Sequence, residues 1–222
     1  NVGQDCTAAT RAYVQRPLYD AFVERVAELM SGVRVGAVDD PATDLGSLIS
    51  RAHRDKVASY IDAGEKDGAK VVVDGRTVKA NGATEGFWLG PTLLDNVTPD
   101  MSIYTDEIFG PVLSVVRVDT YDEALDLINN NPYGNGTAIF TNDGGAARRF
   151  GNEVEVGMVG INVPIPVPMA YYSFGGWKAS LFGDSHAHGT EGVHFFTRAK
   201  AITTRWLDPS HGGINLGFPQ NA

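Results

Sequence analysis

The apolar residues of this chain follow two periods that alternate along the sequence. Short runs rich in Val, Ile, Thr and aromatic residues are typical of strands, and they lie at 11–15, 70–73, 87–89, 92–94, 111–118, 136–141 and 157–162. Apolar residues spaced by three or four positions are typical of helices, which we expect at 17–31, 50–64, 120–129 and 144–154. The alternation indicates an α/β domain with a mostly parallel open sheet and flanking helices.

Local signals mark where three of these helices begin. Pro17 suits a first helical position, since its missing N–H is not needed there. Ser50 can cap the second helix, and Thr120-x-x-Glu123 matches a capping box at the start of the third.

The pattern changes after residue 163. Pro164, Pro166 and Pro168 stiffen a loop, and the segment 195–206 is rich in Phe, Thr, Ile and Trp, which predicts a strand that reaches away from the domain. The last residues offer few side chains that can pack, so we expect them to be poorly ordered. We therefore divide the chain into a main domain at 1–190, a strand segment at 191–207 and a flexible tail at 208–222.

Composition excludes several classes of partner. The net charge of −9 opposes binding to nucleic acid or to an anionic membrane. The sequence has no signal peptide and no apolar stretch that could span a bilayer, so we expect a cytoplasmic location. A single cysteine excludes an internal disulfide. His186-x-His188 near Asp184 has no further ligands at fitting spacing, so we expect a solvated polar loop and no metal site.

Cys6, the only cysteine, allows two interpretations. A lone cysteine is usually a small, buried, inert residue. The neighbours Gln4, Asp5 and Thr7 instead form a polar setting, and Gly3 permits a close backbone approach. A thiol on a polar loop before a strand is also where a nucleophile can lie.

A second candidate site is Glu107-Ile108-Phe109-Gly110-Pro111. A carboxylate can accept hydrogen bonds from both hydroxyls of a ribose, and an aromatic ring two residues later can lie against a nicotinamide. A surface glutamate followed by a core phenylalanine and a turn explains the same letters, and spacing alone favours this simpler interpretation.

Taken in order, the motifs of the chain resemble the C-terminal half of the NAD(P)-dependent aldehyde dehydrogenases. The matching stretches are Gly3-Gln4-Asp5-Cys6, Leu45-Gly46-Ser47-Leu48, Gly90-Pro91-Thr92-Leu93-Leu94, Glu107-Ile108-Phe109-Gly110-Pro111, Asn131-Pro132-Tyr133-Gly134, Gly157–Asn162 and Phe174-Gly175-Gly176-Trp177-Lys178. The resemblance identifies 1–190 as a catalytic domain and 191–207 as an oligomerisation strand that builds a homodimer or homotetramer.

The resemblance also implies roles for single residues. Cys6 matches the nucleophile, which attacks an aldehyde to form a thiohemiacetal and then, after hydride transfer to NAD, a thioester. Glu107 and Phe109 match the contacts to the nicotinamide ribose and ring. Phe174 matches a wall of the substrate tunnel, and Asn162 has an implied structural role. The family's general base, its second oxyanion donor and its Rossmann domain lie outside this chain, which begins close to its thiol, so we expect a fragment.

The two ends of the chain resemble different branches of that family. The stretches 129–141, 163–168, 180–184 and 196–200 resemble CoA-acylating methylmalonate-semialdehyde dehydrogenases, in which CoA accepts the acyl group. That branch usually has arginine before the cysteine, and here this substrate-side position is Asp5. The acid resembles aminoaldehyde dehydrogenases instead, which release a free acid. We expect the acylating branch, with an aminoaldehyde dehydrogenase or a truncated, non-catalytic oligomerisation module as alternatives.

Overall fold

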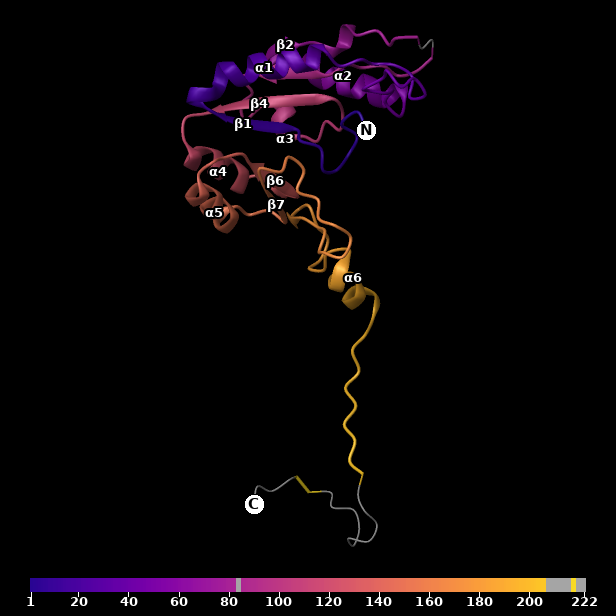
Figure 1. Cartoon of the computed structure of the whole chain (residues 1–222), viewed down its shortest axis with the longest axis vertical. Coiled ribbons are helices and arrows are strands. Elements are labelled where there is room, and N and C mark those ends of the chain that lie inside the picture. Colours follow the sequence, from indigo (N-terminus) through magenta and orange to yellow (C-terminus); the bar gives the residue numbers. More distant parts are fainter. Residues whose placement is uncertain (83–84, 207–216, 219–222) are drawn as a thin grey trace.

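A computed structural model describes residues 1–82, 85–206 and 217–218 of the chain (Figure 1). Its main sheet has four strands in the order β1 (Arg11–Gln15), β4 (Val112–Val118), β3 (Thr92–Asp95) and β2 (Lys70–Val73). β4 pairs in parallel with β1 and β3, and β2 pairs antiparallel with β3. Five of the seven residues of β4 are buried, as expected for a central strand covered on both faces.

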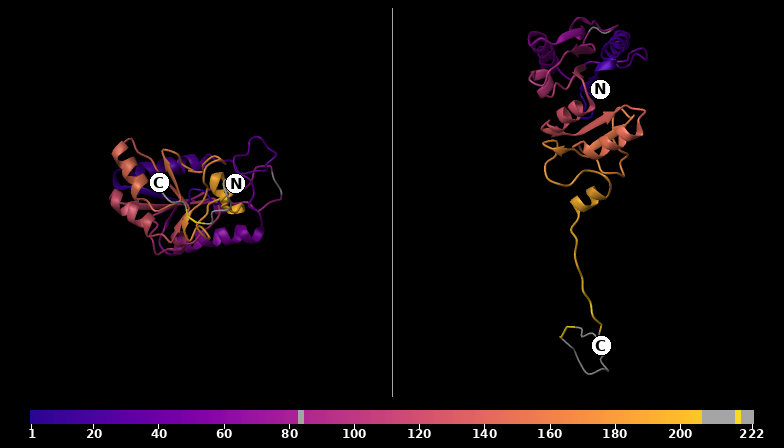
Figure 2. Two further views of the ribbon diagram at one scale, coloured as in Figure 1. Left: turned by 90° about the horizontal axis from the view of Figure 1, so that it is seen from below. Right: turned by 90° about the vertical axis from the view of Figure 1, so that its left-hand side faces the viewer.

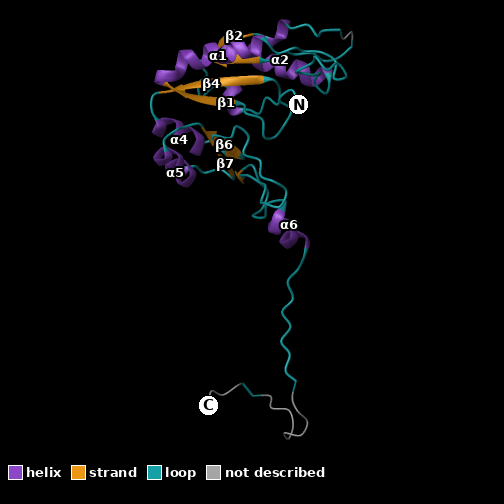
Figure 3. Cartoon of the chain, in the orientation of Figure 1, coloured by secondary structure: helices purple, strands orange, loops and turns teal. Residues whose placement is uncertain are grey.

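The two long helices cover opposite faces of this sheet, and Figure 3 shows both helices beside its strands. Val23 of α1 (Tyr19–Ser31) packs with Leu93 and Val115. Residues of α2 (Arg51–Lys66) pack on the other face with Leu94 and Val116. Side chains alternate between the faces along each strand, so consecutive residues of β3 and β4 divide between the two cores. The short helices η1 (Arg16–Leu18), η2 (Gly75–Thr77) and α3 (Ser102–Thr105) lie in the connections.

The second half of the chain forms a smaller part beneath the main sheet (Figure 1). It contains α4 (Tyr121–Asn129), β5 (Tyr133–Gly134), β6 (Gly136–Ile139), α5 (Gly144–Glu153), β7 (Met158–Ile161) and β8 (Trp177–Lys178). β6 and β7 are parallel, and β5 and β8 are antiparallel. Leu125, Phe150, Val154 and Val156 form its core. The α/β class and the mostly parallel pairing are thus confirmed, although the strands are divided among three sheets.

The cap signals also have their expected structures. The Ser50 hydroxyl accepts a hydrogen bond from the His53 N–H at 3.2 Å, and the Thr120 hydroxyl accepts one from the Glu123 N–H at 3.1 Å. The second helix continues past Gly64 to Lys66. Gly64 is needed for packing rather than as a terminator, because a Cβ there would lie 2.7 Å from the Ile103 side chain.

The C-terminal segment differs from the sequence prediction. Gly189–Phe196 form the helix α6, and residues 197–206 run away from both parts without a strand assignment, as Figure 1 and Figure 2 show. A strand needs a partner edge for its backbone groups, and no strand among the described residues pairs with 197–206. The oligomerisation strand at 191–207 therefore stays a prediction, as do the domain bounds. The expected tail at 208–222 lies outside the described residues except for 217–218. Among described helices, none is both long and apolar enough to cross a membrane.

Candidate active site

The loop that carries Cys6 lies between the main sheet and the β6–β7 part (Figure 1). Val2 anchors it in the core that contains Ile108. Gly3 has φ +70°, and a Cβ on Gly3 would lie 2.0 Å from the Gly110 carbonyl oxygen. This contact places the thiol loop directly on the 107–111 loop, so two of the motifs meet. Cys6 itself is exposed and forms no disulfide.

Cys6 occupies a closed turn. The Ala8 N–H donates to the Asp5 carbonyl oxygen at 3.1 Å, which makes Asp5–Ala8 a β-turn with Cys6 and Thr7 at its centre. One Asp5 carboxylate oxygen accepts from the Thr7 N–H at 2.8 Å and from the Thr7 hydroxyl at 2.6 Å. The other accepts from the Asn1 amide at 2.8 Å. The bonds from Thr7, followed by that from Asn1, hold the pKa of Asp5 below its ordinary value, so its charge persists beside the thiol.

A pocket opens next to this turn, with a volume of about 400 Å³ and a lining of Gln4, Ile49, His53 and Phe109. Phe109 has φ +59°, a strained conformation for a bulky residue. His53 Nε2 lies 2.7 Å from the Phe109 carbonyl oxygen, so it must act as a donor. The Gln4 side-chain oxygen accepts from the Ile49 N–H at 3.0 Å. Glu107 is exposed and makes no hydrogen bond within the described residues.

The Phe174 loop reaches the thiol loop through Asn135. The Asn135 amide donates to the Cys6 carbonyl oxygen at 2.8 Å. Gly176 packs on Asn135, since a Cβ on Gly176 would lie 3.1 Å from the Asn135 Cα. Phe174 is half-buried, its ring centroid 5.6 Å from that of His188. The loop carrying Phe174 is therefore linked to the Cys6 turn through Asn135, although these segments are far apart in sequence.

The whole chain except its last part matches one protein family. The model of the aldehyde dehydrogenase family covers residues 1–202. The chain belongs to the aldehyde dehydrogenase family. It is 52% identical over 219 residues, 98% of its length, to a malonate-semialdehyde dehydrogenase of Pseudomonas aeruginosa, of which it covers 44%.

Two further matches lie in the same branch. A Drosophila melanogaster protein assigned as an acylating, mitochondrial methylmalonate-semialdehyde/malonate-semialdehyde dehydrogenase is 45% identical over 98% of this chain and 42% of that protein. A Sinorhizobium meliloti structure assigned as a methylmalonate-semialdehyde dehydrogenase, in complex with NAD, superimposes with a TM-score of 0.90 at 47% identity, covering 93% of this chain and 42% of that chain. The chain therefore spans less than half the length of these relatives.

Two polar residues of this aldehyde dehydrogenase site were not expected from the sequence. His53 holds the Phe109 carbonyl and Asn135 holds the Cys6 carbonyl. A histidine on an amphipathic helix and an asparagine before a glycine have ordinary explanations, so neither carried a signal. Asn162 has the structural role that was expected: its amide bonds both the N–H and the carbonyl of Thr141, tying the end of β7 to the end of β6.

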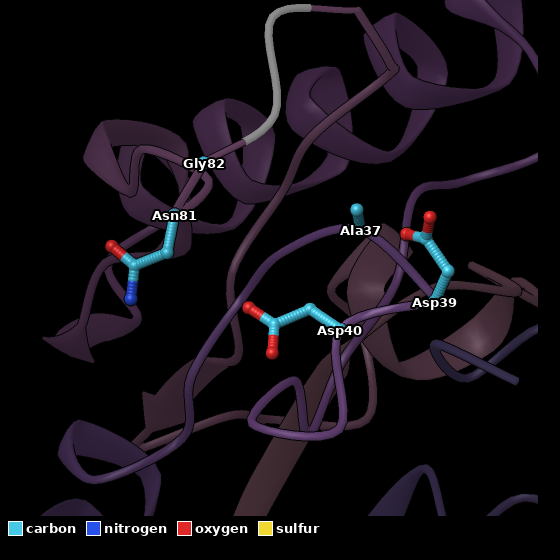
Figure 4. A pocket seen from close by; sticks show the side chains of 5 residues that line it. All are labelled: Ala37, Asp39, Asp40, Asn81 and Gly82. Carbon is cyan, nitrogen blue, oxygen red and sulfur yellow. The ribbon is translucent and has the colours of Figure 1, made fainter.

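Other polar groups lie outside this site. Figure 4 shows a second pocket, whose lining residues are Ala37, Asp39, Asp40, Asn81 and Gly82. It has no nucleophile and no basic group. His186 is engaged with the Ser173 hydroxyl at 2.8 Å. No group of three His, Cys, Asp or Glu side chains that could hold a metal occurs in the described parts of the chain.

Proposed function

We propose that this chain supplies the nucleophile and the nicotinamide side of an NAD-dependent semialdehyde dehydrogenase that acylates CoA. The observation that carries the proposal is the contact of the Cys6 loop with the Phe109 loop, through Gly3 and Gly110, together with its link to the Phe174 loop through Asn135. Each loop matches a motif of the family, and these links support a shared site around the exposed thiol. The names of the related enzymes, malonate- and methylmalonate-semialdehyde dehydrogenase, supply the substrate class and the acyl acceptor.

Cys6 is the group that forms a bond to substrate. Its sulfur attacks the aldehyde carbon, and the carbonyl oxygen takes up negative charge in the thiohemiacetal. The Cys6 N–H makes no hydrogen bond within residues 1–82, 85–206 and 217–218. It is therefore free to donate to that oxygen. Loss of one such donor typically costs about 10²–10³ in rate.

The residues beside the thiol fit a nicotinamide riboside. The half-buried Phe109 ring offers an apolar face in the pocket, and the exposed Glu107 carboxylate two residues earlier has no other partner in the described chain. We assign Phe109 to the ring and Glu107 to the ribose hydroxyls. NAD, when bound, supplies the hydride acceptor. Cys6 retains the acyl group as a thioester until the thiol of CoA attacks it.

At Asp5 this chain departs from the CoA-acylating branch, which usually has arginine just before the cysteine. The Asp5 carboxylate is held in the turn by Thr7 and Asn1 and stays charged. We assign it an electrostatic influence on which aldehydes reach Cys6: it lowers the rate with carboxylated aldehydes, malonate semialdehyde included, relative to an enzyme with arginine at this position. Phe174, on the loop that packs on Asn135, is assigned to the wall of the substrate tunnel.

The remaining parts of the enzyme belong to the same proposal. A Rossmann half would carry the glutamate base and the asparagine oxyanion donor of the family. The segment 191–207 would pair subunits into a homodimer or homotetramer. Its exposed aromatic residues, Phe195, Phe196 and Trp206, are 65–92% accessible in this single chain.

Cys6→Ala in the assembled enzyme tests the proposal. We expect NADH formation from malonate semialdehyde to disappear, with unchanged thermal stability because Cys6 is exposed. Wild-type enzyme should release an acyl-CoA that mass spectrometry detects only when CoA is added. Cys6→Ser, which keeps the shape but is a far weaker nucleophile, should be equally inactive. NADH formation by the Cys6→Ala enzyme would contradict the assignment.

A further inference from the structure

We infer that Asn135 is a positioning residue for the nucleophile, because it locks the central peptide of the turn that carries Cys6. The peptide unit between Cys6 and Thr7 has two polar ends. Asn135 Nδ2 donates to the Cys6 carbonyl oxygen at 2.8 Å, and Asp5 accepts from the Thr7 N–H at 2.8 Å. Both ends of one peptide unit are therefore held by side chains. This inference rests on the proposed function of Cys6.

The central peptide is the part of a β-turn that can rotate. Type I and type II turns have the same ends and differ by a flip of this peptide, which reverses its carbonyl and N–H. A flip here would move the Cys6 carbonyl off Asn135 and the Thr7 N–H off Asp5. It would also change ψ of Cys6, on the residue that carries the reacting sulfur. The hydrogen bonds from Asn135 and to Asp5 therefore favour one orientation of the peptide between Cys6 and Thr7.

Asn135 can hold this peptide because its own backbone is fixed. It lies between β5 and β6, and its carbonyl oxygen accepts from the Met158 N–H at 3.1 Å. The preceding Gly134 is buried, and its N–H donates to the Ser180 hydroxyl at 3.1 Å. Gly176 packs against Asn135 from the side of the Phe174 loop. The donor thus projects from paired strands onto a loop that has no regular secondary structure of its own.

The thiol is exposed and has no hydrogen-bond partner among the described residues, so its direction depends on the backbone. A neutral hydrogen bond contributes about 0.5–1.5 kcal/mol, so its removal lets the alternative turn become populated. Misplacement of a reacting group by about 1 Å can cost about 100-fold in rate. Asn135 makes no contact with the pocket that we assign to NAD, so cofactor affinity should not change.

Asn135→Ala and the isosteric Asn135→Asp test the inference in the assembled enzyme. We expect kcat for NADH formation to fall by about 3- to 10-fold in both, which is the loss of one neutral hydrogen bond, with an unchanged KM for NAD. The rate of Cys6 alkylation by iodoacetamide, followed by mass spectrometry, should change in both variants as well. Because mass spectrometry locates the modification at Cys6, this second readout needs no turnover.

Asn129→Ala is the matched control, since the Asn129 amide likewise bonds a backbone carbonyl, that of Glu153 at 2.9 Å, away from the thiol. It should lower thermal stability without changing kcat or alkylation. Wild-type kcat and alkylation in Asn135→Ala would overturn the inference. So would wild-type behaviour of Asn135→Asp alone, which would assign the effect to side-chain volume, or equal losses in Asn129→Ala. If instead Cys6→Ala kept its activity, the proposed function would fail while the alkylation result still reported on the turn.

Discussion

At Gly3 the thiol loop contacts the 107–111 loop. Gly3→Ala is the substitution whose effect on this contact follows most directly from the structure. Gly3 has φ +70°, where side chains are disfavoured. The added Cβ would lie 2.0 Å from the Gly110 carbonyl oxygen and 2.4 Å from its carbon. Both are backbone atoms, so no flexible side chain can move aside, and the two loops must separate.

The size of the effect follows from these distances. An ordinary contact begins at 3.4 Å, so the loops must move apart by more than an ångström. The left-handed conformation itself costs an alanine about 1–2 kcal/mol. A displacement of about 1 Å between reacting groups can cost about 100-fold in rate. We therefore expect kcat/KM of Gly3→Ala to fall by about 100-fold, and its free energy of unfolding by more than the strain alone.

Gly82→Ala is a control that introduces the backbone strain of a left-handed alanine without displacing the thiol loop. Gly82 has φ +67°, nearly that of Gly3, but a Cβ there meets no atom of the described residues within 4 Å. It should lose about 1–2 kcal/mol of stability by denaturant unfolding and retain wild-type kcat/KM. NADH formation with a semialdehyde measures the second quantity for both variants. If Gly3→Ala were as active as Gly82→Ala, the proposed docking of the thiol loop on Gly110 would be refuted.

Two further predictions concern charges. Asp5→Asn keeps an acceptor for Thr7 but removes the charge, so the ratio of kcat/KM for a carboxylated aldehyde to kcat/KM for an uncharged one should rise several-fold. Asp39→Asn, in the second pocket, is the control and should leave this ratio unchanged. A fall of the ratio in Asp5→Asn would contradict the role of Asp5. Arg117→Met should lower the free energy of unfolding by about 3 kcal/mol near neutral pH, because the Asp95 side chain is 2% exposed and would lose its ion pair at 2.7 Å. Burial opposes ionisation of Asp95, but the bonds from Arg117 and Asn96 outweigh it and lower its pKa. The wild-type advantage in urea unfolding should therefore be full above about pH 4 and shrink as the pH falls through that lowered pKa; an advantage that grows in acid would contradict this.

The elements with local signals were predictable from sequence. β2 has the expected bounds, Lys70–Val73, and the caps at Ser50 and Thr120 make the expected bonds. Each signal acts within a few residues, so it does not depend on distant packing. The division of the strands among separate sheets depends on long-range pairing, which alternation along the chain does not specify.

The C-terminal segment shows where residue preference misleads. The aromatic and β-branched residues after 194 are typical of strands, yet Phe195 and Phe196 end α6. Strand preference reflects packing on a pleated, half-buried surface more than an intrinsic property of the backbone. Among the described residues, no strand pairs with the segment at 197–206, and its composition alone does not determine its structure.

The candidate site likewise has a part that the sequence predicted and a part that it did not. Cys6, Phe109 and Phe174 stand in motifs that resemble a family, so their roles could be proposed before their positions were known. The bonds that join these motifs connect residues far apart: 129 positions separate Asn135 from Cys6, and 56 separate His53 from Phe109. An asparagine before glycine is typical of a turn, and nothing in its neighbours indicates a distant carbonyl. The thiol loop has no regular secondary structure, so its geometry depends on these long-range contacts and on Gly3 against Gly110. The residues that position the nucleophile are therefore the ones that local patterns could not show.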